Sequence, residues 1–293
     1  MRIAIFGKQF SDLFKDSCFS LFKKLRARQA EIIIYKPFYD FLFQKFDIAA
    51  FDFKIFETRK ELKGTDFVLS IGGDGTILQA ITLVRDSNIP IVGINSGRLG
   101  FLADIAEDDI NNAVDHIFNG NYRINEVELL QLNTDNNLFG DLNFALNELA
   151  VHKRDTASMI TVHTFLDGQF LNSYWADGLI VSTSVGSTGY SLSVGGPIIH
   201  PKSQSHVITP IAPHNLTVRP MVVPNHLNIT LKVEGRADTY LASLDSRSEI
   251  FDNSLELNIQ KAPFSIKMID LPGINYYATL RNKLMWGADK RNY

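Results

Sequence analysis

Three glycines and one carboxylate occupy four consecutive positions, Gly72 to Gly75, in the stretch SIGGDGTIL. They follow the apolar run Phe67 to Ile71, which is typical of a buried strand, and precede a segment with helical spacing, Thr76 to Arg85. Glycines let a backbone approach an anion, and the first N–H groups of a helix favour phosphate. Asp74 would repel that anion, so its presence indicates proton transfer from a hydroxyl or placement of magnesium beside a triphosphate. A glycine turn in which Asp74 or Thr76 caps the helix is the alternative.

A second candidate is the pair Asn147 and Glu148, which interrupts the apolar stretch ALNELAV. Adjacent strand residues point to opposite faces, so one member of the pair is expected to face inward. A buried polar group needs a hydrogen-bond partner. The pair therefore predicts either a ligand contact or a structural hydrogen bond to a neighbouring loop.

The third candidate is the stretch Trp175 to Pro201, WADGLIVSTSVGSTGYSLSVGGPIIHP. A strand at Leu179 to Ser182 leads into a loop rich in glycine and hydroxyl groups, Gly186 to Tyr190, which is expected to open a short helix. Tyr190 offers a ring for stacking or a hydroxyl for hydrogen bonding. So many hydroxyls beside glycines favour a ligand site over a plain turn between strands.

The elements that must position these residues form two patterns along the chain. The first third alternates apolar runs with helix-length segments, which predicts a parallel α/β sheet. Its expected strands are Arg2 to Gly7, Glu31 to Tyr35, Phe67 to Ile71 and Ile89 to Ile94. Its expected helices are Leu13 to Arg28, with Leu13, Leu21, Phe22 and Leu25 on one face, then Thr76 to Arg85, and Glu107 to Phe118.

After about Tyr122 the residues become β-prone and are interrupted by turns, which predicts mainly antiparallel sheet. The expected strands are Val127 to Asn133, Leu142 to His152, Met159 to Asp167, Gln169 to Trp175, Leu179 to Ser182, Leu227 to Glu234 and Leu255 to Gln260. A final helical segment, Tyr276 to Trp286, has Leu280, Leu284 and Met285 available for burial against the first domain. We therefore expect an α/β nucleotide-binding domain at 1–125, a β-rich domain at 126–273 and a returning helical segment at 274–293.

Composition limits the partners and the compartment. With 293 residues, 45% of them hydrophobic, the chain is long enough for two domains with cores of their own. A formal net charge of -3 argues against a general nucleic-acid binder. The single cysteine, Cys18, and an N-terminus unlike a signal peptide indicate the cytoplasm. No run of about 18 apolar residues predicts a membrane span.

Taken together, the motifs resemble the NAD kinase family, whose members phosphorylate the adenosine 2′-hydroxyl of NAD. GGDGT alone also occurs in lipid kinases related to diacylglycerol kinase, but the ordered set covers nearly the whole chain. That set comprises GGDGT at Gly72 to Thr76, NSGRLGFL at Asn95 to Leu102, the pair Asn147 and Glu148, DGLIVST with GSTGYSLS, PIAPHNLTVRPMVVP at Pro210 to Pro224, and SLDSR at Ser243 to Arg247.

The resemblance implies roles for individual residues. Asp74 would be the catalytic base, with Gly75 and Phe101 against the nucleotide. Asn147 and Glu148 would bind the ribose or adenine of the dinucleotide, and Asp177 would contact the nicotinamide end or its ribose. The adenosine pocket would be lined by Thr188, Gly189, Tyr190, Ser191, Leu192 and Ser193. Arg247 of SLDSR matches a nucleotide-contacting position of the family by place but not by side chain.

Three further positions depart from the family pattern. The substrate loop most often reads TPTGSTAY, so this chain loses a hydroxyl at Val185 and has Gly189 in place of an alanine. Trp175 stands where many relatives have a basic residue, which removes one expected substrate contact. Asp74 is unaffected by these changes.

The resemblance also implies the reaction components. NAD is the substrate, ATP or polyphosphate is the donor, and magnesium screens the donor's charge, whereas the metal ligands are not assigned. The active site is expected in the cleft between the domains, completed in a homo-oligomer, a dimer or tetramer, with no nucleic acid or membrane as partner. Two alternatives remain at this point. A lipid kinase of the diacylglycerol type would share GGDGT but leaves Asn147 and GSTGYS unexplained, and a non-catalytic nucleotide-binding regulator would not need Asp74.

Overall fold

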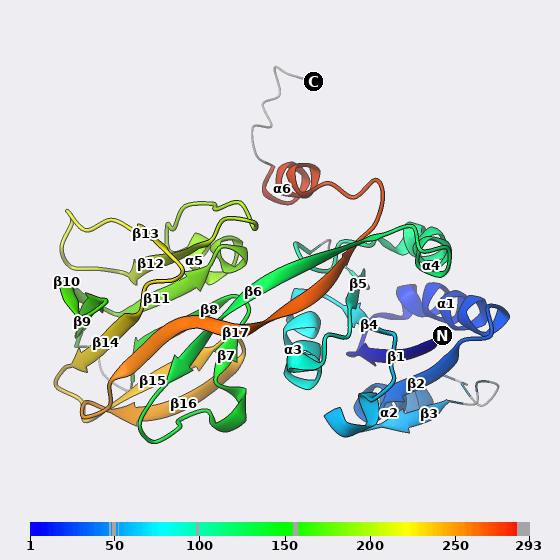
Figure 1. The fold of residues 1–293 in the computed structure, drawn as a ribbon, viewed down its shortest axis with the longest axis horizontal. Coiled ribbons are helices and arrows are strands. Elements are labelled where there is room, and N and C mark those ends of the chain that lie inside the picture. The colour runs from blue at the N-terminus through cyan, green and yellow to red at the C-terminus, as the bar shows by residue number, and fades with distance from the viewer. Residues whose placement is uncertain (47, 49–50, 52, 98–99, 155–157, 286–293) are drawn as a thin grey trace, which may run out of the picture. The chain divides into compact units, whose positions relative to one another are not determined.

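The computed structural model of the protein describes residues 1–46, 48, 51, 53–97, 100–154 and 158–285. The chain divides into two compact units (Figure 1). Unit 1 comprises Met1–Glu126 and the C-terminal segment from Ile266, and unit 2 comprises Val127–Ser265. The chain therefore enters unit 2 within strand β6 (Arg123–Asn133) and returns to unit 1 within strand β17 (Leu257–Asp270).

Unit 1 is built on a parallel sheet in the order β17, β5, β4, β1, β2, β3. The central strand β4 pairs Leu69 with Ile5 on one side and with Val92 on the other. All six residues of β4 are buried, which is why this strand is a continuous apolar run without alternation. The strands confined to unit 1 are β1 (Arg2–Gly7), β2 (Glu31–Tyr35), β3 (Lys54–Phe56), β4 (Phe67–Gly72) and β5 (Ile91–Asn95).

Helices of unit 1 contribute apolar faces to the core of this sheet. Cys18, Leu21, Phe22 and Leu25 of α1 are buried there, as are Ile110, Val114 and Ile117 of α4. The helices are α1 (Lys15–Ala27), α2 (Lys36–Lys45), α3 (Asp74–Val84), α4 (Ile110–Phe118) and α6 (Tyr276–Leu284). Short 3-10 turns occupy Asp12–Phe14, Arg59–Leu62, Arg85–Ser87 and Glu107–Asp109.

Unit 2 contains two groups of β-strands, each built of antiparallel neighbours along its main path. In one group β10, β9, β14 and β17 lie in that order with β6 and β7 attached, and in the other the order is β13, β12, β11, β8, β15, β16. One continuous apolar core contains side chains of both groups. The strands are β7 (Phe144–Ala145), β8 (Glu148–Lys153), β9 (Ile160–Leu166), β10 (Gln169–Ala176), β11 (Gly178–Thr183), β12 (Ser205–Ile211), β13 (Met221–Pro224), β14 (Ile229–Glu234), β15 (Thr239–Leu244) and β16 (Arg247–Asp252).

The predicted fold class, a parallel α/β part followed by a mainly antiparallel β part, is confirmed. Three local predictions were wrong. Leu13 is 89% exposed because it lies in a 3-10 turn before α1 begins. The single strand expected from Leu142 to His152 is broken into β7 and β8. Met285 is 71% exposed because it follows the end of α6, whereas Leu280 is buried as expected. Residues 286–293 of the predicted C-terminal segment lie outside the described residues.

Among the residues that the structure describes, every helix is too short or too polar to cross a membrane.

Candidate functional site

The GGDG stretch joins a buried strand to a helix, as its sequence predicts. Strand β4 ends at Gly72, and α3 begins at Asp74. A side chain added at Gly73 or Gly75 would meet nothing within 4 Å, so the backbone of this turn is open to a ligand. An open first turn with its N–H groups and helix dipole is a favourable place for an anion.

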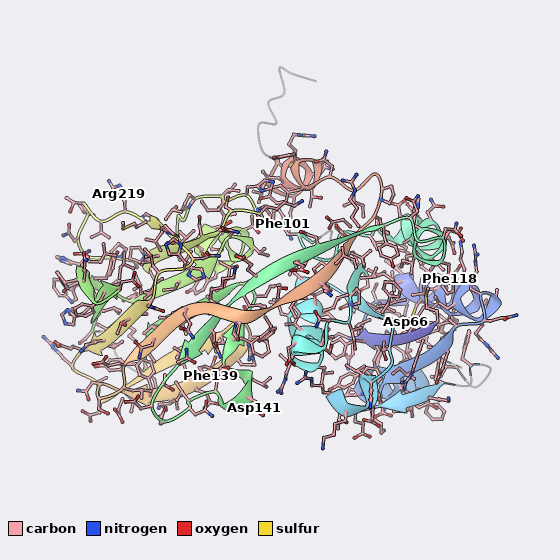
Figure 2. The ribbon with its side chains drawn as sticks, in the orientation of Figure 1. Asp66, Phe101, Phe118, Phe139, Asp141 and Arg219 are labelled. Carbon is pink, nitrogen blue, oxygen red and sulfur yellow. The ribbon has the colours of Figure 1, made fainter. Side chains whose placement is uncertain are left out.

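Asp74 directs its carboxylate to the loop after β5. The backbone N–H of Phe101 donates to Oδ2 at 2.9 Å, and those of Leu102 and Ala103 donate to Oδ1 at 2.9 and 3.0 Å. Phe101 is labelled in Figure 2. Gly100 permits this approach, because a Cβ there would lie well under 3.0 Å from Oδ1. These bonds show that the carboxylate is bound by a distant loop, whereas a capping aspartate would bond the N–H groups of its own helix.

Charges gather around Asp74 within unit 1. Burial raises the pKa of Asp104 to about 7, with smaller contributions from the negative charges of Asp270 and Asp74. Lys283 of α6 places its Nζ 3.4 Å from Asp74 Oδ2. The loop Phe101 to Asp104 therefore brings one aspartate into the field of another, and a lysine balances part of that charge. Arg98 and Leu99 of the NSGRLGFL motif lie outside the described residues.

In unit 2 another aspartate, Asp245, fixes the backbone of the Asn147–Glu148 pair. Asp245 accepts backbone N–H groups from Leu146 at 2.9 Å, Asn147 at 2.8 Å and Glu148 at 3.2 Å. Its backbone has a positive φ of 53° at the turn between β15 and β16. Burial raises the pKa of Asp245, and the three N–H groups and Arg247 oppose that effect. The break between β7 and β8 follows from these bonds, since the N–H groups of this segment bind a side chain.

Glu148 faces the loop that precedes α5 (Tyr190–Ser193). Burial raises its pKa to about 8, and the negative charge of Asp245 adds to the rise, while a hydrogen bond from the Tyr190 backbone lowers it. Oε2 is buried without a hydrogen-bond partner among the described residues. A Cβ on Gly189 would lie 3.2 Å from this oxygen. An unsatisfied buried oxygen at this place is a group that a ligand could satisfy.

Glu148→Gln is expected to stabilise the protein increasingly as the pH rises from about 4.5 to about 8. In that range the unfolded chain releases the Glu148 proton, whereas the folded chain keeps it, so the folded wild type loses stability as pH rises. Glutamine does not titrate, so its advantage in unfolding free energy should grow by on the order of 2 to 4 kcal/mol. Urea denaturation at pH 5 and pH 8 measures it. Glu249→Gln on exposed β16 is the matched control, and an equal advantage of Glu148→Gln at both pH values would contradict the assignment.

Hydroxyl groups of the loop from Gly186 to Tyr190 and of the following helix mostly bond within unit 2. Ser187 Oγ donates to the Ser184 carbonyl at 2.7 Å and accepts the Ile199 N–H at 3.0 Å. Ser191 Oγ lies 3.0 Å from Thr209 Oγ1, and Thr188 Oγ1 donates to the Val185 carbonyl at 3.2 Å. The abundance of hydroxyls therefore shapes the turn at Val185–Thr188, while the more exposed Tyr190 and Ser193 are available for contact.

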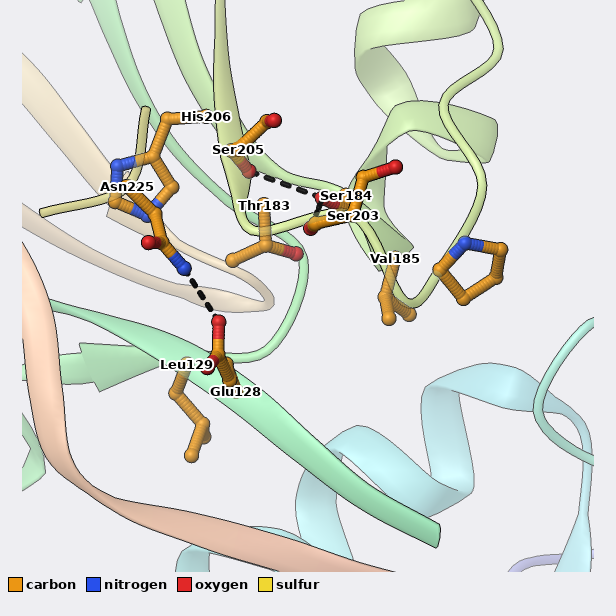
Figure 3. Close-up of a pocket in the computed structure, with 10 residues that line it drawn as sticks. Glu128, Leu129, Thr183, Ser184, Val185, Ser203, Ser205, His206 and Asn225 are labelled. Atoms are coloured by element: carbon orange, nitrogen blue, oxygen red, sulfur yellow. Dashed lines mark hydrogen bonds between the residues drawn. The ribbon is translucent and has the colours of Figure 1, made fainter. Parts of the chain in front are cut away.

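A polar cavity of about 20 Å³ lies beneath the start of this loop. It is lined by Glu128, Leu129, Thr183, Ser184, Val185, Pro201, Ser203, Ser205, His206 and Asn225 (Figure 3). Ser184 Oγ donates to the carbonyls of Ser203 and Ser205, and the Asn225 amide donates to Glu128. Burial lowers the pKa of His206 to about 4. The cavity has the size of one water molecule, and the hydrogen bonds of Ser184 beside it hold the start of the loop.

Tyr190 of α5 and Asp177, which lies between β10 and β11, both contact residues of β8. The Tyr190 ring, 38% exposed, stacks on His152 of β8 with centroids 5.7 Å apart. Asp177 forms an ion pair of 2.6 Å with Lys153, also from β8. Trp175 remains 51% exposed beside His214, with ring centroids 4.2 Å apart. These aromatic and acidic groups give unit 2 a surface suited to a planar, polar ligand.

The Arg247 side chain binds other groups of unit 2. Its guanidinium donates to the carbonyls of Leu142 and Phe144, lies 5.3 Å from the Phe144 ring centroid and is 4.0 Å from Asp245 Oδ2. Its contacts thus hold the chain before β8. The residue of SLDSR that contacts the Asn147–Glu148 pair is Asp245, which was not among the predicted site residues. Its place in the same motif was the available signal.

The predicted site residues fall into two groups, each within one unit. Asp74, Gly75 and Phe101 come together in unit 1, and Asn147, Glu148, Gly189 and Tyr190 come together in unit 2. Lys283 was not among the predicted site residues, because a lysine in the last turn of a helix is common and by itself indicates only a helix end.

Comparison with known protein families assigns both parts of the chain. Residues 29–122 match the ATP-NAD kinase N-terminal domain, and residues 146–271 match the ATP-NAD kinase C-terminal domain. The fold is also similar to that of a yeast NADH kinase solved in complex with NADH, with a TM-score of 0.87 over 99% of this chain and 88% of that chain at 20% identity. A second similar structure is an NAD kinase from Archaeoglobus fulgidus in complex with ATP, with a TM-score of 0.76 over 97% of this chain and 99% of that chain at 26% identity.

Whole-length relatives give the same assignment. The chain is 49% identical to an NAD kinase of Cytophaga hutchinsonii over 292 residues and 48% identical to one of Flavobacterium johnsoniae over 295 residues, with 100% of both chains covered in each case. The lipid-kinase alternative is not favoured, because both domains match NAD kinase models and the relatives match from end to end. The chain belongs to the NAD kinase family.

Proposed function

We propose that this protein transfers the terminal phosphoryl group of ATP to the adenosine 2′-hydroxyl of NAD, giving NADP. The observation that carries the proposal is the carboxylate of Asp74 at the open first turn of α3. Relatives of nearly equal length support it, since they are NAD kinases, and the Archaeoglobus relative was solved with ATP. Polyphosphate is the second candidate donor that the family resemblance allows.

In this mechanism Asp74 is the general base. A ribose hydroxyl is a poor nucleophile at neutral pH, so transfer depends on in-line positioning and on charge stabilisation. The proton of the 2′-hydroxyl moves to Asp74 while the 2′-oxygen forms a bond to the terminal phosphorus of ATP. The bond between that phosphorus and ADP breaks, and its electron pair stays on the ADP oxygen. The backbone N–H groups at the start of α3, including that of Gly75, steady the phosphates.

Magnesium fits this site as an ion carried by the donor. The described residues contain no cluster of three or more His, Cys, Asp or Glu side chains that could hold a metal. Magnesium typically keeps several waters and binds one or two carboxylates together with substrate phosphates. Asp74 is the side chain that would reach it, and the ion would supply charge neutralisation on the donor phosphates.

On the acceptor side we propose that unit 2 binds NAD. Asn147 and Glu148 bind the ribose or adenine, because Asp245 fixes their backbone and leaves Glu148 Oε2 available. Asp177 binds the nicotinamide end or its ribose. The family resemblance also gives Phe101 a nucleotide contact, and Arg247 acts by holding the segment before β8. The remaining contacts come from Thr188, Gly189, Tyr190, Ser191, Leu192 and Ser193.

The experiment that tests the function is incubation of the purified protein with ATP, magnesium and NAD, followed by detection of NADP. Parallel reactions in which polyphosphate replaces ATP, or NADH replaces NAD, compare the rates with each donor and each acceptor. A diacylglycerol substrate serves as the comparison. Formation of phosphatidic acid without NADP would contradict the proposal, and so would tight binding of both nucleotides without turnover.

Tyr190→Ala is expected to weaken NAD binding about tenfold while changing ATP affinity little. The substitution removes an aromatic surface that stacks on His152, and one stacking contact of a base on an aromatic ring is worth roughly 1 to 3 kcal/mol. Calorimetry with each nucleotide measures both affinities. Tyr190→Phe is the matched control, because it keeps the ring, and equal losses for NAD and ATP in Tyr190→Ala would show that the loop has unfolded.

We further propose a homo-oligomer, a dimer or tetramer, in the cytoplasm. The support for the oligomer is the family resemblance, and the support for the compartment is a sequence with one cysteine. Sedimentation at several protein concentrations gives the subunit number, and a monomer at all concentrations would contradict the first part.

A further inference from the structure

A lysine of the C-terminal helix α6 lies directly beside the carboxylate of Asp74. Lys283 Nζ is 3.4 Å from Asp74 Oδ2 and 4.5 Å from the centroid of the Phe101 ring. The face of an aromatic ring attracts a cation, so the ring and the carboxylate both attract the ammonium group. The Lys283 side chain is 32% exposed. The ammonium is therefore held between a carboxylate and a ring while it remains within reach of a ligand from solvent.

Helix α6 fixes this position through its own packing in unit 1. The Asn275 side chain caps the helix by accepting the Tyr277 N–H at 2.9 Å. Leu280 is 2% exposed, and the Tyr276 ring lies 6.4 Å from the Phe101 ring. Lys283 follows Leu280 by three residues and so projects from a neighbouring part of the helix surface. Its place beside Asp74 is thus set by a packed helix.

The hydrogen bonds of Asp74 show which partner can leave. An ionised carboxylate has about four lone-pair positions. Backbone N–H groups of Leu102 and Ala103 use Oδ1, while Oδ2 takes the Phe101 N–H and faces Lys283. Release of the backbone donors would dismantle the loop, whereas a lysine side chain moves by rotation about its own bonds. A proton can therefore reach Oδ2 most easily when Lys283 moves away.

We propose that Lys283 is a catalytic residue: it pairs with Asp74 in the protein without substrates and binds a non-bridging oxygen of the transferred phosphoryl group when both substrates are present. This inference rests on the proposed kinase function. When both substrates are present, the anionic phosphoryl oxygens compete with Asp74 Oδ2 for the ammonium, and its departure opens Oδ2 to the 2′-hydroxyl proton. The positive charge is then available to the phosphoryl oxygens while the new O–P bond forms and the bond to ADP breaks.

Lys283→Met is expected to lower kcat/KM for ATP by roughly ten- to a hundredfold in total, through a lower kcat and a higher KM for ATP, the usual range for loss of a charge-assisted hydrogen bond. The KM for NAD should change little. Arg281→Met removes the same charge from an exposed position two residues earlier on α6 and is the matched control. Lys283→Arg keeps the charge and should recover part of the activity, because guanidinium geometry differs from that of an ammonium.

A second measurement separates phosphate binding from mere support of Asp74. In the Asp74→Asn background Lys283 has lost its carboxylate partner and is free to bind the phosphates of ATP. Adding Lys283→Met to that background should weaken the binding of ATP with magnesium about tenfold. Calorimetry of wild type, both single variants and the double variant gives this cycle, and thermal unfolding of each confirms that it is folded.

The outcomes are distinct. If wild type forms no NADP, the proposed function fails. If wild type forms NADP and Lys283→Met behaves like Arg281→Met, the role of Lys283 is overturned while the function stands. Equal ATP affinity of Asp74→Asn and the double variant would show that Lys283 only positions Asp74, which also overturns the proposal. Faster turnover by Lys283→Met would do the same, because the contact would then be inhibitory.

Discussion

Replacing Asp74 with asparagine is expected to reduce the turnover of NADP formation by about 10²- to 10⁴-fold, the usual range for removal of a general base. Asparagine has nearly the same size but cannot take the proton of the ribose 2′-hydroxyl. Its amide oxygen can still accept the N–H groups of Leu102 and Ala103, which now bind Oδ1. NAD should bind as well as before or slightly better, because a negative charge near the pyrophosphate is gone.

The measurement is NADP formation at saturating NAD and ATP, with NAD affinity determined separately by calorimetry. Asp108→Asn, an exposed acidic position before α4, controls for loss of one surface charge. Thermal unfolding detects any loosening of the loop, since the amide group of asparagine no longer accepts the Phe101 N–H. Turnover close to that of wild type would mean that Asp74 serves only to shape the turn, and the proposed mechanism would be wrong.

Gly186→Ala is expected to raise the Kd for NAD at least tenfold and to lower the free energy of unfolding by about 1 to 3 kcal/mol, the usual cost of overpacking. A Cβ at this position would lie well under 3.0 Å from the carbonyl oxygen, carbonyl carbon and Cα of Asn147. All three are backbone atoms and cannot rotate away. The Asn147 carbonyl also accepts the Thr183 N–H at 2.8 Å. The turn at Val185–Thr188 must therefore move away from Asn147.

Gly189→Ala is the matched control for this effect. A Cβ there would lie 3.2 Å from Glu148 Oε2, an atom of a side chain that can adjust, and 3.2 Å from the Gly186 carbonyl oxygen. The family pattern has alanine at this place, so a loop of this kind accommodates a Cβ there. Calorimetry with NAD and urea denaturation of both variants test the pair. Equal behaviour of the two variants would show that the close approach of Gly186 to Asn147 does not support the site.

Local patterns predicted those elements whose burial follows directly from their own residues. β1, β2 and β4 are apolar runs because a central parallel strand is covered on both faces, so their boundaries could be read almost to the residue. The same patterning missed α2, whose aromatic-rich sequence KPFYDFLFQK shows no clear helical period. It also missed β12, β13, β15 and β16, where short runs interrupted by polar residues are ambiguous.

The sequence by itself determined the family, the two-part fold and the positions of the three motifs, because these depend on residue types and on spacing over a few turns. Only the tertiary structure decided what each polar group binds. Asp245 accepts N–H groups from three residues that precede it by 97 to 99 positions in the chain. Lys283 contacts Asp74, which precedes it by 209 positions. Such contacts leave no local periodicity, since they arise where separate strands, turns and helices pack against one another. Tertiary packing therefore decides which groups Asp74 and Glu148 contact, whereas the sequence already shows that both positions have carboxylates.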